Sequence, residues 1–147
     1  MAAHFRLQAV LDLAVRRLDA ATVELQKLRA RLQQAQDKLE QLYGYRADYQ
    51  TALAAALAEG LEADRLRDFQ AFLAKLARAI EAQGAEVQRC RQVWEEEHRR
   101  WLQLRSREQA LQVLRTRHEH AESQRDARVE QKQQDEFAHR RGHGEPA

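Results

Sequence analysis

Apolar side chains recur at every seventh position along the first part of the chain. With Leu11 as position a of a heptad, the a and d positions up to residue 56 are occupied by Leu7, Leu11, Ala14, Leu18, Ala21, Leu25, Leu28, Leu32, Ala35, Leu39, Leu42, Arg46, Tyr49, Leu53 and Ala56. Arg46 is the only polar residue among them. A heptad pattern of this length is typical of a coiled coil, whose narrow apolar seam packs against one partner helix. The pattern predicts a helix over residues 5–58.

A second run of the same pattern follows a short interruption. Its a and d positions are Leu66, Phe69, Leu73, Leu76, Ile80, Gln83, Val87, Cys90, Trp94, Glu97, Trp101 and Leu104, with a weaker continuation through Leu111 and Leu114. In the interruption, Gly60 is suited to a left-handed conformation just past a helix end, and Asp64 to capping the next helix. We therefore expect a turn at 59–64 and a helix over 65–137. Residues 138–147 have the composition of a disordered tail.

The two runs are related by a fold-back at residues 61–62, which places residue i opposite about residue 123 − i. Small Ala21 then faces bulky Trp101, and Ala35 faces Val87, as uniform packing requires. The second run also loses its apolar pattern beyond residue 121, where the first helix would provide no further partner. A parallel dimer of one long helix explains neither observation. The sequence thus predicts an all-α fold, a long antiparallel two-helix coiled-coil hairpin forming one domain over residues 1–140.

Composition agrees with this fold and excludes several classes of protein. Charged residues make up 33% of the chain, aromatic residues 6%, and most other positions are strong helix formers. No apolar stretch is long enough to span a bilayer, and the amino terminus lacks a secretory signal. Cys90 is the single cysteine, which suits a reducing cytoplasm. With no catalytic motif, no expected cofactor and no metal-binding set, an enzyme is not expected. The net charge of +2 argues against wholesale nucleic-acid binding.

An aromatic-rich strip lies near the predicted bend. It comprises Leu42, Tyr45 and Tyr49 on the first helix, and Phe72, Leu76, Ala79 and Gln83 on the second. Tyr45, Phe72 and Ala79 occupy g positions beside the seam, where packing does not need them. Two interpretations remain open: a docking surface for another protein, or side chains that merely wrap over the seam.

Arginines are concentrated in one stretch of the second helix. They are Arg99, Arg100, Arg105, Arg107, Arg115 and Arg117, with Glu108 as the only acidic residue between the first and the last. Such a run is usually a solvated face with pairs at helical spacing. It is alternatively a contact for an acidic partner near the open end of the hairpin.

Several local features together resemble one known family. They include the stretch from Leu7 to Ala14, the Gln33-Gln34-Ala35 segment, Gly60 at the bend, the aromatic spacings on both sides of it, and the late segment from Gln131 to Ala138. The chain resembles the FliJ family, a soluble component of the bacterial flagellar type III export apparatus. The resemblance covers essentially the whole length.

The resemblance implies a non-enzymatic, stalk-like coiled coil that binds the flagellar export ATPase, the cytoplasmic part of an export-gate membrane protein, and flagellar export chaperones. It implies a protein that is monomeric alone and cytoplasmic, at the inner membrane face of the flagellar base without inserting into the membrane. Carried over by position, the gate-binding patch is Leu42, Tyr45, Tyr49, Phe72, Leu76 and Ala79. At Lys38 and Gln83 the chain departs from the family pattern, in which an amide and a histidine are usual, so their part in the patch stays open. Candidate contacts with the ATPase ring, chosen from the arginine run, are Arg99, Arg100, Arg105 and Arg107.

Two other functions fit the same coiled-coil pattern. A self-assembling scaffold would form parallel dimers, which a measured mass distinguishes from a single hairpin. A helical hairpin that binds nucleic acid through the arginine run would show steeply salt-dependent binding.

Overall fold

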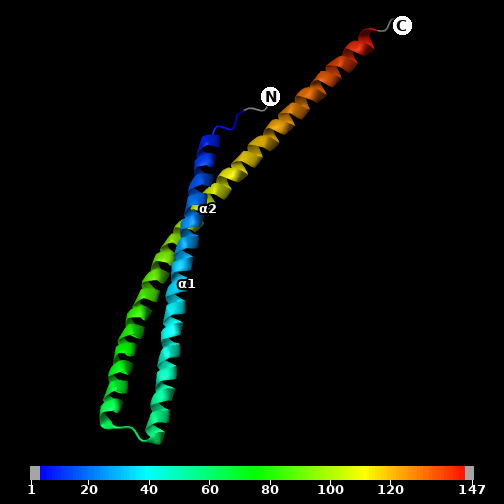
Figure 1. The fold of residues 1–147 in the computed structure, drawn as a ribbon. Coiled ribbons are helices and arrows are strands. Elements are labelled where there is room, and N and C mark those ends of the chain that lie inside the picture. The colour runs from blue at the N-terminus through cyan, green and yellow to red at the C-terminus, as the bar shows by residue number, and fades with distance from the viewer. Residues whose placement is uncertain (1–3, 145–147) are drawn as a thin grey trace. The chain divides into compact units, whose positions relative to one another are not determined.

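Two long helices account for the regular structure of the described residues. The structure is a computed structural model that describes residues 4–144, and the side chains of residues 4–142. Helix α1 spans Gln8–Glu59 and helix α2 spans Ala63–Gly144, and the described residues contain no strand (Figure 1). The all-α prediction is confirmed.

The bend between the helices is built by Gly60. Its φ of 93° is the left-handed conformation predicted for it, and its N–H donates to the Leu57 carbonyl at 3.3 Å. A residue with a Cβ atom is strained at this φ, which explains glycine at the end of α1. Asp64 lies within the first turn of α2 rather than before it, because the helix already begins at Ala63.

The other helix ends differ from the expected ones. A turn in which the Gln8 N–H donates to the Phe5 carbonyl precedes α1, so this helix starts at Gln8 and not at residue 5. Helix α2 continues to Gly144, which corrects its expected end at residue 137 and the expected disorder of 138–144. Interactions within the helix accompany this extension, such as the Arg141 guanidinium 5.1 Å from the Phe137 ring centroid. The rest of the expected tail, residues 145–147, lies outside the described residues.

The chain forms two compact units, and each contains a part of both helices. The bend unit comprises Ala20–Trp101, and within it the chain reverses direction so that α1 and α2 run antiparallel (Figure 1). Its core is a cluster of Leu32, Ala35 and Val87, with Leu39 and Cys90 packed against it. Ala35 and Val87 are the small and large partners that the fold-back register predicted.

Two hydrogen bonds join the helices across the bend unit. The Trp101 Nε1–H donates to Thr22 Oγ1 at 2.8 Å, and the Gln83 Nε2–H donates to the Ala35 backbone carbonyl at 3.0 Å. Thr22 is the neighbour of Ala21, the residue that the predicted register placed opposite Trp101. Because hydrogen bonds are directional, these two contacts favour one alignment of the helices over a slip by a heptad.

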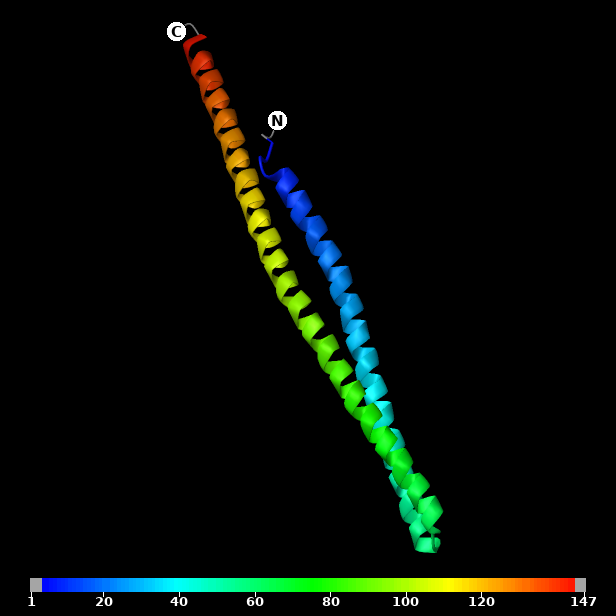
Figure 2. The same cartoon turned by 90° about the vertical axis from the view of Figure 1, so that its left-hand side faces the viewer.

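The terminal unit comprises Met1–Asp19 and Leu102–Ala147. Its core contains Leu11, which is fully buried, with Ala14 and Leu111, and Phe5 and Val15 pack against them. Within this unit α2 continues past the start of α1, as the orange and red part of the ribbon shows (Figure 2). Every described side chain from residue 123 to residue 142 is exposed. Thus the apolar seam of α2 ends near the level at which α1 begins, as predicted.

Candidate partner-binding surface

Tyr49 is the centre of the aromatic strip in the bend unit. Its ring centroid lies 4.3 Å from that of Phe72 and 5.0 Å from that of Phe69, both on α2. These tilted pairs connect the two helices near the bend. Tyr49 is half-buried, whereas Phe72 keeps 44% of its surface exposed. Phe72 therefore leaves part of its ring accessible to solvent, while the rest packs against Tyr49.

Tyr45 is the most exposed aromatic residue of the strip. It retains 51% of its surface, and its hydroxyl accepts a hydrogen bond from Gln41 Nε2 at 2.8 Å on the same helix. Tyr43, one of the flanking aromatic residues of α1, is 44% exposed. The Arg46 guanidinium lies 5.1 Å from the Tyr43 ring centroid, so this polar seam residue directs its charge to the surface.

The other predicted patch residues divide between core and surface. Leu76 is buried and Leu42 half-buried, so both belong to the packing between the helices. Ala79 is exposed. The patch thus consists of an accessible layer of Tyr45, Phe72 and Ala79 on a packed base.

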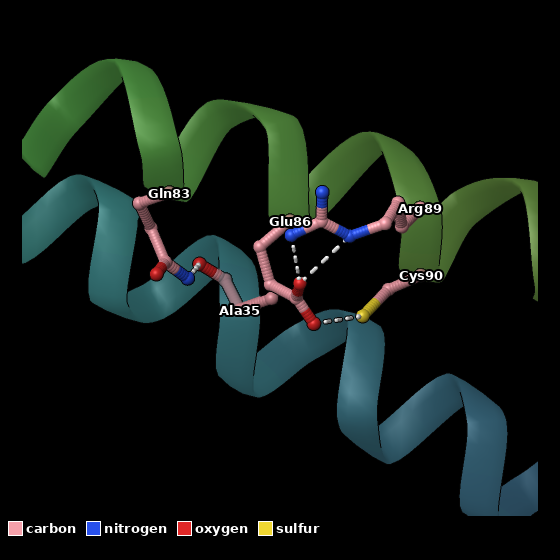
Figure 3. Close-up of polar contacts among 5 residues, drawn as sticks. All are labelled: Ala35, Gln83, Glu86, Arg89 and Cys90. Atoms are coloured by element: carbon pink, nitrogen blue, oxygen red, sulfur yellow. Dashed lines mark hydrogen bonds and ion pairs between the residues drawn. The ribbon is translucent and has the colours of Figure 1, made fainter.

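Gln83 and Lys38, whose part in the predicted patch was left open, have different environments. The Gln83 amide is partly buried, and its bond to the Ala35 carbonyl uses it in the helix–helix contact (Figure 3). Lys38 is exposed on α1, and its charge helps to lower the pKa of Glu86 on α2.

Glu86 joins a small polar group beside Cys90. Its carboxylate accepts two hydrogen bonds from the Arg89 guanidinium, at 2.6 and 3.0 Å, and one from Cys90 Sγ at 3.5 Å (Figure 3). The bonds from Arg89 and then from Cys90 lower the pKa of the Glu86 carboxyl. Burial, followed by the bond to Glu86, raises the pKa of the Cys90 thiol. Cys90 is therefore a weakly nucleophilic core residue, as its d position indicates.

A stack of three rings lies on α2 in the bend unit, and the sequence reading did not identify it. His98 stacks between Trp94 and Trp101, with ring centroids 4.9 and 6.0 Å apart and interplanar angles of 14° and 16°. From α1, the Arg29 guanidinium approaches the Trp94 ring to 5.4 Å. The sequence does contain the pattern that indicates this stack, since the rings of Trp94, His98 and Trp101 have the spacing i, i+4 and i+7 and so share one helix face.

The four arginines considered for ATPase binding fall in different units. Arg99 and Arg100 belong to the bend unit, Arg105 and Arg107 to the terminal unit, and all four are exposed on α2. Arg115, further along the run, instead pairs with Glu119 at 3.1 Å.

The structure gives no sign of a metal centre or of a membrane span. Across the described residues, no three His, Cys, Asp or Glu side chains are placed to hold a metal ion. Within these residues, neither helix has a stretch apolar and long enough to cross a bilayer.

Comparison with known proteins gives one consistent result. The family model described as "Flagellar FliJ protein" matches residues 3–146. Two relatives, each named "Flagellar FliJ protein", are similar over 140 residues: one from Salmonella typhi at 31% identity and one from Escherichia coli (strain K12) at 30%. In both cases the match covers 95% of this chain and 95% of the relative.

Proposed function

From the premise that this chain belongs to the flagellar FliJ family, we propose that it is a non-enzymatic component of the flagellar protein-export apparatus. It binds the export ATPase and the cytoplasmic part of the export-gate membrane protein, and so couples ATP hydrolysis and the proton gradient to the export of flagellar proteins. It also contacts export chaperones. It acts at the cytoplasmic face of the inner membrane, at the flagellar base.

The exposed layer of the aromatic strip carries this proposal. Tyr45 and Phe72 expose 51% and 44% of their surfaces, although both stand beside a seam that could have covered them. Underneath, the Tyr49 ring at 4.3 Å from Phe72 and the buried Leu76 hold the layer in a fixed position. Rigid aromatic side chains presented in this way are the residue types that dominate binding energy at protein interfaces. A gate protein with a complementary apolar pocket would bury them.

The double variant Tyr45→Ala, Phe72→Ala tests the gate contact. Both residues are largely exposed, so the variant should keep its helix content while its affinity for the cytoplasmic part of the gate protein falls at least tenfold. A tenfold loss corresponds to about 1.4 kcal/mol, which is less than the roughly 2 kcal/mol or more that truncating a single interface hot spot costs. Isothermal titration calorimetry measures the affinity, and swimming of a strain that carries the variant as its only copy measures function.

Tyr43→Ala is the matched control. Tyr43 is as exposed as Phe72 and contacts Arg46 on its own helix, but it lies at an e position rather than in the strip. Its removal should leave gate affinity and swimming nearly unchanged. Full motility together with undiminished gate binding by the double variant would refute the assignment of the strip.

The contact with the ATPase is proposed for the exposed arginines of α2, namely Arg99, Arg100, Arg105 and Arg107. Their positive charge suits an acidic surface. Changing all four to Ser should weaken binding to the purified export ATPase and make the remaining binding less dependent on salt, while gate binding is retained. Equal ATPase affinity of the variant and the original chain at low salt would exclude this surface.

A further inference from the structure

The terminal unit has more apolar surface than its seam requires. Val10 and Leu13 of α1 are 37% and 42% exposed, although buried Leu11 and Ala14 already supply the contact with α2. Val10 and Leu13 line a shallow groove between the helices together with Ala14 and, from α2, Leu104. The unit thus leaves a small, mostly apolar groove between its two helices, and Val10 and Leu13 beside it stay accessible.

Two arginines, one from each helix, also line this groove. Arg17 of α1 and Arg107 of α2 complete the lining of the groove. Both are exposed, and among the described residues no ion pair joins either of them to a carboxylate. Arg17 follows Val10 by one heptad on α1, so the charge and the apolar side chain repeat along the same side of the helix. The groove is therefore lined mostly by apolar side chains, and Arg17 and Arg107 add positive charge beside them.

We propose that this groove binds an amphipathic helix of a partner protein, with an apolar row that covers Val10 and Leu13 and acidic residues that pair with Arg17 and Arg107. A helix fits because the side chains of two neighbouring helices form ridges and grooves into which a third helix packs. Acidic residues of the partner helix fit because a carboxylate placed beside the Arg17 and Arg107 guanidinium groups would be attracted to their positive charge. The inference goes beyond the proposed function. It names the chemistry of the partner helix, and it assigns a binding role to Val10, Leu13 and Arg17 of α1, which belong to neither surface proposed above.

Synthetic peptides test this proposal on the full-length chain. One peptide is a fluorescein-labelled helix with leucine at a and d positions and glutamate beside them, and a second carries lysine in place of each glutamate. A third has serine in place of leucine and keeps the glutamates. Fluorescence anisotropy should show binding of the first peptide only. Equal binding of the third peptide would overturn the proposal, because a simple attraction of polyanions needs no apolar row.

Charge reversal locates the site. The variant Arg17→Glu, Arg107→Glu should bind the Leu/Glu peptide at least tenfold more weakly and should gain binding of the Leu/Lys peptide, a gain that an unfolded terminal unit could not produce. The variant Val10→Ser, Leu13→Ser should also lose at least tenfold while keeping both arginines. The matched control Arg65→Glu, Arg91→Glu changes two exposed arginines of the bend unit and should leave binding unchanged.

Two results would refute the site. One is unaltered binding of the Leu/Glu peptide by the Arg17→Glu, Arg107→Glu variant, and the other is an equal loss in the control. Neither result concerns gate binding through Tyr45 and Phe72, so the proposed gate contact and this inference can fail separately. Arg107 is the one residue that this groove shares with the proposed ATPase contact.

Discussion

Leu32→Ala is the substitution that most directly measures the core of the bend unit. Leu32 is 2% exposed and packs with Ala35 and Val87. The change removes three carbon groups, which at about 0.8 kcal/mol each gives roughly 2.4 kcal/mol of lost transfer free energy. The cavity left behind adds to this loss, but a core only two helices thick can partly collapse around it. We therefore expect the free energy of unfolding to fall by about 2–3 kcal/mol.

Leu57→Ala provides the comparison at constant chemistry. Leu57 lies on the same helix but is 51% exposed, so about half of its transfer free energy, roughly 1 kcal/mol, is at stake. Alanine and leucine are both strong helix formers, and hence helix propensity changes little in either variant. The losses in free energy of unfolding should differ by about 1–2 kcal/mol between the two variants only if Leu32 faces a partner helix and Leu57 does not.

Urea denaturation followed by circular dichroism at the helix band measures both variants. Each should be measured at two protein concentrations, because unfolding of an intramolecular hairpin does not depend on concentration, whereas unfolding of a dimer does. Equal destabilisation by the two variants would refute the placement of Leu32 in the core. A midpoint that rises with protein concentration would refute the folding of the hairpin within one chain.

Two further predictions concern contacts of the bend unit. The Trp101–Thr22 hydrogen bond should appear as a coupling free energy of about 0.5–1.5 kcal/mol in a double-mutant cycle of Trp101→Phe and Thr22→Val, whereas additive effects would mean that the bond contributes nothing. For the Cys90 thiol, whose pKa is raised, the pH midpoint of iodoacetamide alkylation should lie above the ordinary value near 8.5, and Glu86→Gln should lower it. Because the raised pKa favours the neutral thiol, its contribution to stability is complete below the pKa of the unfolded thiol and is lost as pH rises through the folded value. Equal midpoints for the folded and the urea-unfolded chain would contradict this environment.

The antiparallel pair of helices could be predicted because its determinants are local. A heptad repeat specifies helix and seam together, since side chains seven residues apart share one helix face. Gly60 marks the bend because only glycine adopts its φ of 93° without strain. Once the bend is placed, equal rise per residue fixes the partner of each seam position. The contact of Trp101 with Thr22 lies one residue from the Ala21–Trp101 pair that this arithmetic predicted.

The sequence pattern did not predict where α2 ends or which residues of the aromatic strip are exposed. Residues 138–144 contain glycine and histidine, so their composition indicated a tail, but backbone hydrogen bonding continues the helix to Gly144. Of the residues carried over for the gate patch, Leu76 is buried and Tyr45 is exposed, although both are apolar and lie near the bend. Exposure depends on how the facing helix covers a position, and the pattern of a single helix does not contain this information.

Two helices, the bend between them and the approximate pairing of their positions could be derived from the sequence alone, because periodicity and glycine conformation are properties of the local chain. Which side chains the helix–helix contact buries and which it leaves exposed could be seen only in the folded chain. The tertiary structure assigned the Gln83 amide to the Ala35 carbonyl, and it left Val10 and Leu13 open between Arg17 and Arg107. The physical reason is that burial and hydrogen bonding are satisfied between helices, by atoms that are far apart in the sequence.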